Sequence, residues 1–122
     1  MNRVEINPVW LMHVQKPARY VGGEWNSVMK NHADVDVKVA LAFPDVYEVG
    51  MSHLGLKIIY SVINSRKDAL AERVYTPWVD MEKMMREINI PPYALESNAP
   101  IKDFDVLGLT MPYEMCYTNI LN

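Results

Sequence analysis

The sequence predicts an α/β fold built on a doubly wound, Rossmann- or flavodoxin-like parallel sheet. Three observations favour this class. Apolar strand patterns alternate with helical patterns along the chain, the first strand is the most apolar, and prolines and other turn residues separate the elements. Such alternation implies right-handed crossovers between parallel strands, and the most apolar strand takes the centre of the sheet. We therefore expect the strand order 2-1-3.

The clearest strand pattern covers residues 35–43. Val35, Val37 and Val39 alternate with other residues, and the last part of the segment, as far as Phe43, is apolar on both faces. This is typical of a central strand that helices cover on both sides. Further strands are expected at residues 73–76, 93–95 and 105–110, and a helical tail is expected from Glu114 onward.

Two helices are expected between these strands. The first begins near Leu54, ends near Asn64, and has an apolar stripe of helical spacing formed by Leu54, Ile58, Ile59, Val62 and Ile63. The second has Asp80 as its N-cap, and its stripe of Met81, Met84, Met85 and Ile88 is expected to pack in the core.

The chain divides into an irregular N-terminal arm, residues 1–33, and an α/β domain, residues 34–122. In the arm, Asn7 before Pro8 predicts the start of a short helix, and Gly22-Gly23 predicts a turn. Three or four strands are fewer than a doubly wound domain usually has, and the third strand would keep a free edge. We therefore expect a truncated sheet, the front part of a longer domain; a complete minimal domain is the alternative.

Composition excludes several classes of protein. The chain has 122 residues, 50% of them hydrophobic and 22% charged, as in an ordinary globular domain. A net charge of −3 without a dense basic stripe gives no nucleic-acid signature. The single cysteine, Cys116, excludes an internal disulfide and is expected to be a buried apolar residue. No apolar run approaches the length of about 18 residues that spans a membrane, and the N-terminus is not a signal peptide, so the expected location is cytoplasmic.

The candidate site lies where loops leave the carboxyl ends of the first and third strands, because open parallel sheets bind ligands there. Two carboxylates, a phenol and a helix start flanked by glycines fall in the first loop: Asp45, Tyr47, Glu48, Gly50, Ser52, His53 and Gly55. The second loop adds Thr110, Tyr113 and Glu114. Backbone N–H groups at the helix start would favour a phosphate or another anion. No residue is assigned as catalytic, and the two glycines equally suit a turn and close helix packing.

Several stretches of the chain are characteristic when read together: KPARYVGGE at 16–24, FPDVYEVGMSHLG at 43–55, ERVYTPWVDM at 72–81, LES at 95–97, DFDVLG at 103–108, YE at 113–114 and YTNILN at 117–122. In this order they resemble the N-terminal region of a family of radical S-adenosylmethionine (radical SAM) proteins. In that family a cobalamin-binding-like domain precedes a radical SAM barrel. The resemblance covers about residues 16–122.

The resemblance implies a barrel beyond residue 122 whose C-x-x-x-C-x-x-C motif holds a [4Fe–4S] cluster that cleaves S-adenosylmethionine. The 122 residues lack this motif, so the parent protein would be the enzyme and this part would be inactive alone. The implied partners are the barrel of the same polypeptide, which Arg19 and Glu24 are expected to face, and a small-molecule cofactor.

Cobalamin is the cofactor that the resemblance implies for this domain. Relatives ligate cobalt with the histidine of D-x-H-x-x-G, which His53 matches, although Met51 stands at the aspartate position and Leu56 at the last glycine. His53 is thus the one candidate metal ligand.

Two alternatives remain open. A cofactor-free docking or structural domain of the same protein would give no spectral change with hydroxocobalamin. A stand-alone flavodoxin-like domain would bind a phosphate, flavin or nucleotide at the same loop. Gly50 and Gly55 have the spacing of a P-loop, but Leu56 stands where that motif has its lysine.

Overall fold

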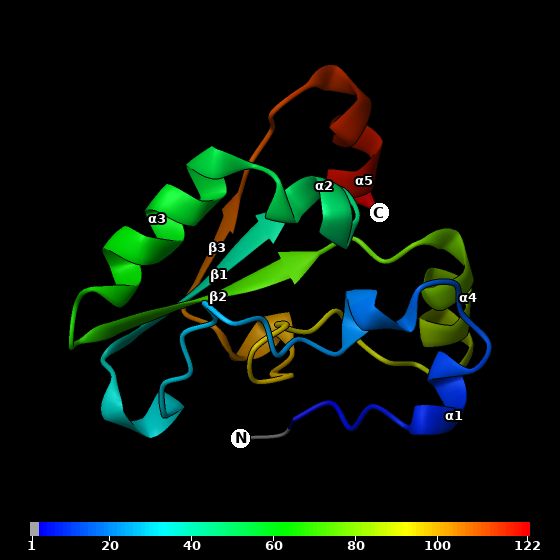
Figure 1. Cartoon of the computed structure of the whole chain (residues 1–122), viewed down its shortest axis with the longest axis horizontal. Coiled ribbons are helices and arrows are strands. Elements are labelled where there is room, and N and C mark those ends of the chain that lie inside the picture. Colours follow the sequence, from blue (N-terminus) through cyan, green and yellow to red (C-terminus); the bar gives the residue numbers. More distant parts are fainter. Residues whose placement is uncertain (1–2) are drawn as a thin grey trace.

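The computed structural model describes residues 3–122, so residues 1–2 of the predicted arm lie outside the described residues. Its centre is a three-stranded sheet, formed by β1 (Val37–Phe43), β2 (Ala69–Tyr75) and β3 (Val106–Leu109). The order is β2-β1-β3 and both pairs are parallel (Figure 1). The predicted fold class and strand order are therefore confirmed.

Short helices precede, connect and follow the strands. Helix α1 (Pro8–Leu11) begins at Asn7 as predicted, because the Asn7 side chain accepts a hydrogen bond from the Val9 N–H group. Helices α2 (Tyr47–Met51) and α3 (Leu54–Asn64) follow β1, α4 (Val79–Glu87) follows β2, and α5 (Tyr117–Leu121) follows β3. Four 3₁₀ turns complete the elements: Pro17–Tyr20, His32–Asp34, Ile101–Asp103 and Glu114–Cys116.

The structure corrects one predicted loop and one predicted strand boundary. The loop expected before α3 contains the helix α2. Strand β2 begins at Ala69, four residues before the expected start at Arg73, because residues 69–72 also pair with β1.

The structure also corrects the strand expected at residues 93–95 and the expected N-cap of α4. Residues 93–95 form no strand of the sheet: Tyr93 makes only an isolated antiparallel bridge with Pro100. Trp78, rather than Asp80, is the N-cap of α4, and Asp80 lies in its first turn, where a carboxylate suits the positive end of the helix dipole.

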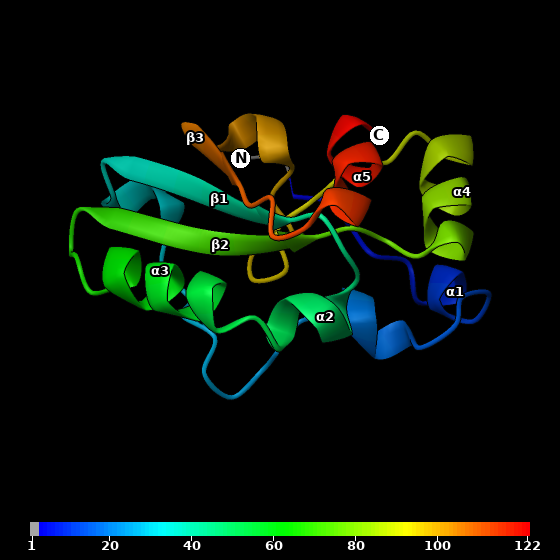
Figure 2. The same ribbon diagram turned by 90° about the horizontal axis from the view of Figure 1, so that it is seen from above.

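The two faces of the sheet are covered differently. Leu41 and Phe43 of β1 pack with Leu56 and Tyr60 of α3 on one face. On the other face, Ala40, Ala42 and Val74 pack with Ala94 and, further out, with Ile101 and Phe104. That second face is covered by an irregular segment with a 3₁₀ turn and not by a helix, as Figure 2 shows from above.

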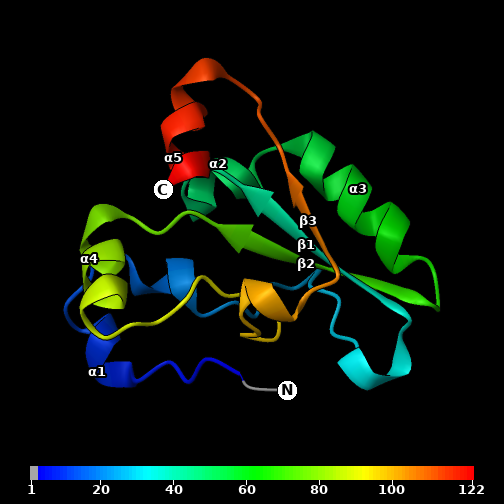
Figure 3. The same ribbon diagram turned by 180° about the vertical axis from the view of Figure 1, so that it is seen from behind.

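The arm packs against α4 rather than standing apart from the domain. Val14 and Tyr20 form a core cluster with Met81 and Met85, which are the buried members of the methionine stripe. Helices α1 and α4 lie side by side at one end of the molecule (Figures 1 and 3). Burial of apolar surface therefore fixes the arm.

Helix α3 turns most of its expected core stripe toward the outside. Its buried residues are Leu56 and Tyr60, which also have helical spacing. Four members of the predicted stripe are between 46% and 70% exposed: Leu54, Ile58, Ile59 and Val62. The helix was predicted correctly, but its buried face was not, because α3 is apolar on more than one side.

Candidate functional site

The loops that leave β1 and β3 meet at the carboxyl end of the sheet. The Tyr113 hydroxyl donates a hydrogen bond to the Asp45 carboxylate, and this bond raises the pKa of Tyr113. Asn119 of α5 donates from its side-chain amide to the carbonyl oxygen of Pro44, at 2.9 Å. The segment after β3 thus folds back over the loop after β1.

Glu48 and Ser52 of the first loop are occupied by groups of the chain itself. Glu48 accepts hydrogen bonds of 2.9 and 3.0 Å from Nε of Arg19, and the Lys16 ammonium lies 3.6 Å away. The bond from Arg19 holds the pKa of Glu48 below its usual value. The hydroxyl of Ser52 donates to the carbonyl oxygen of Glu48, at 2.8 Å.

His53 caps the start of α3. Its Nδ1 atom accepts a hydrogen bond of 3.2 Å from the Leu56 N–H group, so in the neutral ring the proton lies on Nε2. The ring packs on Phe43, with ring centroids 5.0 Å apart. A Cβ atom on Gly55 would lie 3.0 Å from the His53 ring, so this glycine leaves room for the cap.

Tyr47 and Gly50 of α2 pack against Tyr75 at the end of β2. The two tyrosine rings meet edge to face, with centroids 5.7 Å apart. A Cβ atom on Gly50 would lie 2.2 Å from the Tyr75 ring, so only glycine allows this approach. Burial raises the pKa of Tyr75 to about 12.

A cavity of about 30 Å³ lies beside these tyrosines. Tyr47 and Tyr75 line it together with Arg19, Tyr20 and Tyr93, among others. Its volume is enough for one or two water molecules. Of the ten predicted binding residues, only Tyr47 lines this cavity.

Thr110 and Glu114 complete the predicted set. The Thr110 N–H group donates to the carbonyl oxygen of Ala42, at 3.2 Å. The Thr110 hydroxyl oxygen is buried and has no hydrogen-bond partner among residues 3–122. Glu114 begins a 3₁₀ turn and is exposed.

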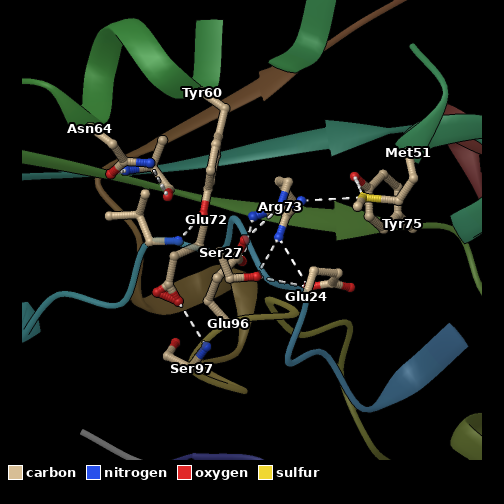
Figure 4. A network of polar contacts seen from close by, with 12 residues as sticks. Glu24, Ser27, Met51, Tyr60, Asn64, Glu72, Arg73, Tyr75, Glu96 and Ser97 are labelled. Atoms are coloured by element: carbon tan, nitrogen blue, oxygen red, sulfur yellow. Dashed lines mark hydrogen bonds and ion pairs between the residues drawn. The ribbon is translucent and has the colours of Figure 1, made fainter. Parts of the chain in front are cut away.

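A second polar cluster, which the sequence analysis missed, is buried around β2 (Figure 4). Its centre is Arg73, which is 5% exposed. The Arg73 guanidinium lies 2.6 Å from the Glu96 carboxylate and 3.2 Å from that of Glu24, and it also donates to the Ser27 hydroxyl. The guanidinium carbon stands 4.7 Å from the centroid of the Tyr60 ring, a cation–π distance.

Burial and ion pairing act in opposite directions in this cluster. Burial disfavours the charge of Arg73, but the neighbouring Glu96 outweighs it and raises the pKa of Arg73. Burial alone would raise the pKa of Glu24. Hydrogen bonds, including the one from Ser27, and the positive charge of Arg73 outweigh this effect and lower the pKa of Glu24. In Glu96 the effect of burial prevails over that of Arg73, and the pKa of Glu96 is raised.

Glu72 makes a related contact on the other side of β2. Its carboxylate lies 2.7 Å from Nε2 of His32 and accepts a hydrogen bond from the Ser97 N–H group. The polar neighbours Asn31 and Asp34 are typical of an exposed segment, but His32 itself is buried. It is buried because Glu72 offers it a polar partner inside.

The arm residues Arg19 and Glu24, which are expected to face the barrel, pair with Glu48 and Arg73 of this chain. The sequence also contained a signal for the buried cluster. The signal was the charged pair Glu72-Arg73 in an otherwise apolar strand, since buried charges require partners. The network also joins three of the characteristic stretches, 16–24, 72–81 and 95–97.

Within residues 3–122, no group of three or more His, Cys, Asp or Glu side chains is placed to hold a metal ion. Cys116 is buried, as predicted. Over the same range, none of the helices combines the length and the apolar character needed to cross a membrane.

Comparison with known proteins gives one result. Residues 55–122, more than half of the chain, match the family model described as the N-terminal region of radical SAM proteins. The chain belongs to this family. Membership indicates a radical SAM domain in the same polypeptide, whereas the match contains no statement about cobalamin. No curated protein matches the chain, and no solved structure does.

Proposed function

We propose that this chain is a docking module that packs against the radical SAM domain of the same polypeptide. The outward apolar face of α3, formed by Leu54, Ile58, Ile59 and Val62, is the observation that carries the proposal. Soluble domains rarely leave contiguous apolar side chains in water unless a partner covers them. Covering this face would remove the side chains from water and stabilise the two domains together.

The carboxyl end of the sheet supports docking better than cofactor binding. Asp45, Glu48, Ser52 and His53 already make hydrogen bonds within the chain. The cavity beside Tyr47 has room for one or two waters. A ligand as large as a corrin ring would have to displace several of these contacts. We assign the [4Fe–4S] cluster and S-adenosylmethionine to the radical SAM domain.

The docking proposal is tested with Ile58→Glu combined with Val62→Glu, made both in this chain and in the longer polypeptide that carries the radical SAM domain. Both side chains are exposed here, so the variant of the 122-residue chain should keep its free energy of unfolding within about 1 kcal/mol. In the longer polypeptide, we expect limited proteolysis to separate the two domains faster.

Ser61→Glu is the matched control, because Ser61 is an exposed residue of the same helix but lies outside the apolar set. The control should leave the proteolysis rate unchanged. Equal proteolysis rates for the double variant, the control and the wild type would contradict the docking proposal.

A second candidate function is a cobalamin-binding-like module. Its support is the buried Thr110 hydroxyl at the carboxyl end of the sheet, which has no hydrogen-bond partner in the described part of the chain, together with the start of α3. His53 does not fit the role of cobalt ligand while its Nδ1 caps α3, because Nε2 then carries the proton. Backbone N–H groups near Ser52 and Gly55 would instead hold a phosphate or amide group of the cofactor, whose bound cobalt supplies the redox chemistry.

Titration with hydroxocobalamin, followed by visible absorption, tests this second function. A saturable spectral change that Thr110→Val weakens would support it. No spectral change at any concentration would reject cobalamin binding, and the docking proposal would be unaffected.

A further inference from the structure

The two edges of the sheet differ in how their backbone groups are satisfied. On the outer edge of β2, the Leu95 N–H group donates to the carbonyl oxygen of Arg73, at 2.8 Å. The Arg73 N–H group donates to the carboxylate of Glu96, also at 2.8 Å. The segment around residue 95 therefore closes this edge.

The outer edge of β3 has no such cover among residues 3–122. Asp105, which directly precedes β3, donates its N–H group to the carbonyl oxygen of Lys38 in β1, and alternate residues of a parallel strand point to the same neighbour. The N–H groups of Val106 and Gly108 therefore point away from β1. Neither of these two N–H groups donates a hydrogen bond to a residue beyond the sheet within the described part of the chain.

The side chains of β3 are those of an inner strand. Val106 is 48% exposed on the α3 side of the sheet, and Leu107 and Leu109 are 45% and 47% exposed on the opposite side. Strands that are apolar on both faces normally lie inside a sheet. Natural edge strands carry lysine, proline or a bulge that prevents pairing, and the sequence VLGL of β3 has none of these.

We propose that the outer edge of β3 pairs with a further β-strand of the same polypeptide, from the part that includes the radical SAM domain, in parallel orientation. The inference rests on the proposed function for the identity of this partner. Family membership places additional chain in the polypeptide. Both existing strand pairs are parallel, and α5 follows β3 as the beginning of the connection that a parallel neighbour requires.

A second copy of this chain fits the edge less well. Pairing of two β3 strands about a two-fold axis would join only four residues from each chain. It would satisfy the backbone but leave Val106 uncovered on one face and Leu107 and Leu109 on the other. A strand with its connecting helices covers the edge and the faces together.

Amide hydrogen exchange, resolved by residue, tests the inference in this chain and in the longer polypeptide. We expect the amides of Val106 and Gly108 to exchange rapidly here and to slow by about 100-fold or more in the longer polypeptide. The amides of Leu107 and Leu109, which face β1, should be protected in both and serve as internal controls.

Rapid exchange of Val106 and Gly108 in the longer polypeptide would overturn the inference. Protection that appears in the 122-residue chain and increases with its concentration would also overturn it, in favour of a second copy. The variant Val106→Pro provides a further test. If it makes the Gly108 amide exchange faster in the longer polypeptide while the 122-residue chain that carries it still folds, the inference is supported. The 122-residue variant should fold, since proline is tolerated where the N–H group that it removes would be free.

The two proposals fail independently. If the α3 double variant speeds proteolytic separation of the two domains while the Val106 and Gly108 amides exchange rapidly in the longer polypeptide, docking through α3 is supported and strand pairing is wrong. If the β3 amides are protected and the double variant has no effect, strand pairing stands and docking through α3 is wrong.

Discussion

The two edges of one small sheet perform different tasks. The edge at β2 is closed by residues 94–97 and by the buried Arg73 network, so its stability comes from this chain alone. The edge at β3 is open over the described residues, and its side chains are apolar on both faces. Within this chain, stabilising contacts are concentrated on the β2 side, whereas the β3 side is the edge that we propose for association.

The largest effect is expected from Arg73→Met on the closed side. Removing the guanidinium leaves Glu24 and Glu96 as uncompensated buried charges, which costs about 3–5 kcal/mol of unfolding free energy. Urea denaturation measures this loss. Arg66→Met is the control, because its ion pair with Asp68 is exposed to solvent and should leave the unfolding free energy nearly unchanged. Similar losses for both variants would mean that the network does not stabilise this edge.

Truncation of one leucine on each side sharpens the contrast. Leu70 of β2 is 1% exposed, so Leu70→Ala should cost about 2–5 kcal/mol through lost burial and the cavity that remains. Leu107→Ala in β3 should cost less than about 1 kcal/mol, because that side chain is already half in water. Chemical denaturation of the 122-residue chain compares the two, and equal losses would remove the distinction between the edges.

Substitution of Gly50, which packs against Tyr75 at the end of β2, should lower stability by an intermediate amount. In Gly50→Ala the added methyl group would overlap the Tyr75 ring and force α2 away from it. The expected cost is about 1–3 kcal/mol, measured as a lower melting temperature. Gly55→Ala, which meets the His53 ring at 3.0 Å, should cost less. An unchanged melting temperature for Gly50→Ala would show that close packing does not require this glycine.

The smallest effect concerns pH on the closed side. The pKa of Glu24 is lowered in the fold, since hydrogen bonds, including that from Ser27, and Arg73 together outweigh the effect of burial. Its stabilisation is therefore complete above the unfolded pKa of about 4.3 and is lost as the pH falls through the lower folded value. Calorimetry should find wild type more stable than Glu24→Gln at pH 7, with the difference decreasing below about pH 4. A constant difference would contradict the assignment.

Local patterns were sufficient for much of the fold. The alternation in residues 35–43 identified the central strand, and the spacing of Asn7 and Pro8 identified the start of α1. The family resemblance is confirmed at the level of a radical SAM N-terminal domain. The candidate site was less accessible, because Glu48 and His53 offer the same side chains whether they bind a ligand or, as here, Arg19 and the Leu56 N–H group.

The sequence by itself determined the order of elements, the parallel sheet and the identity of its central strand. These depend on periodicity and turn residues, which are local properties of the chain. Only the tertiary structure decided which face of α3 is buried, which partners Arg73 and His32 find, and which edge of the sheet is closed. The physical reason is that these outcomes depend on contacts between residues far apart in the sequence, where alternative partners of similar chemistry compete.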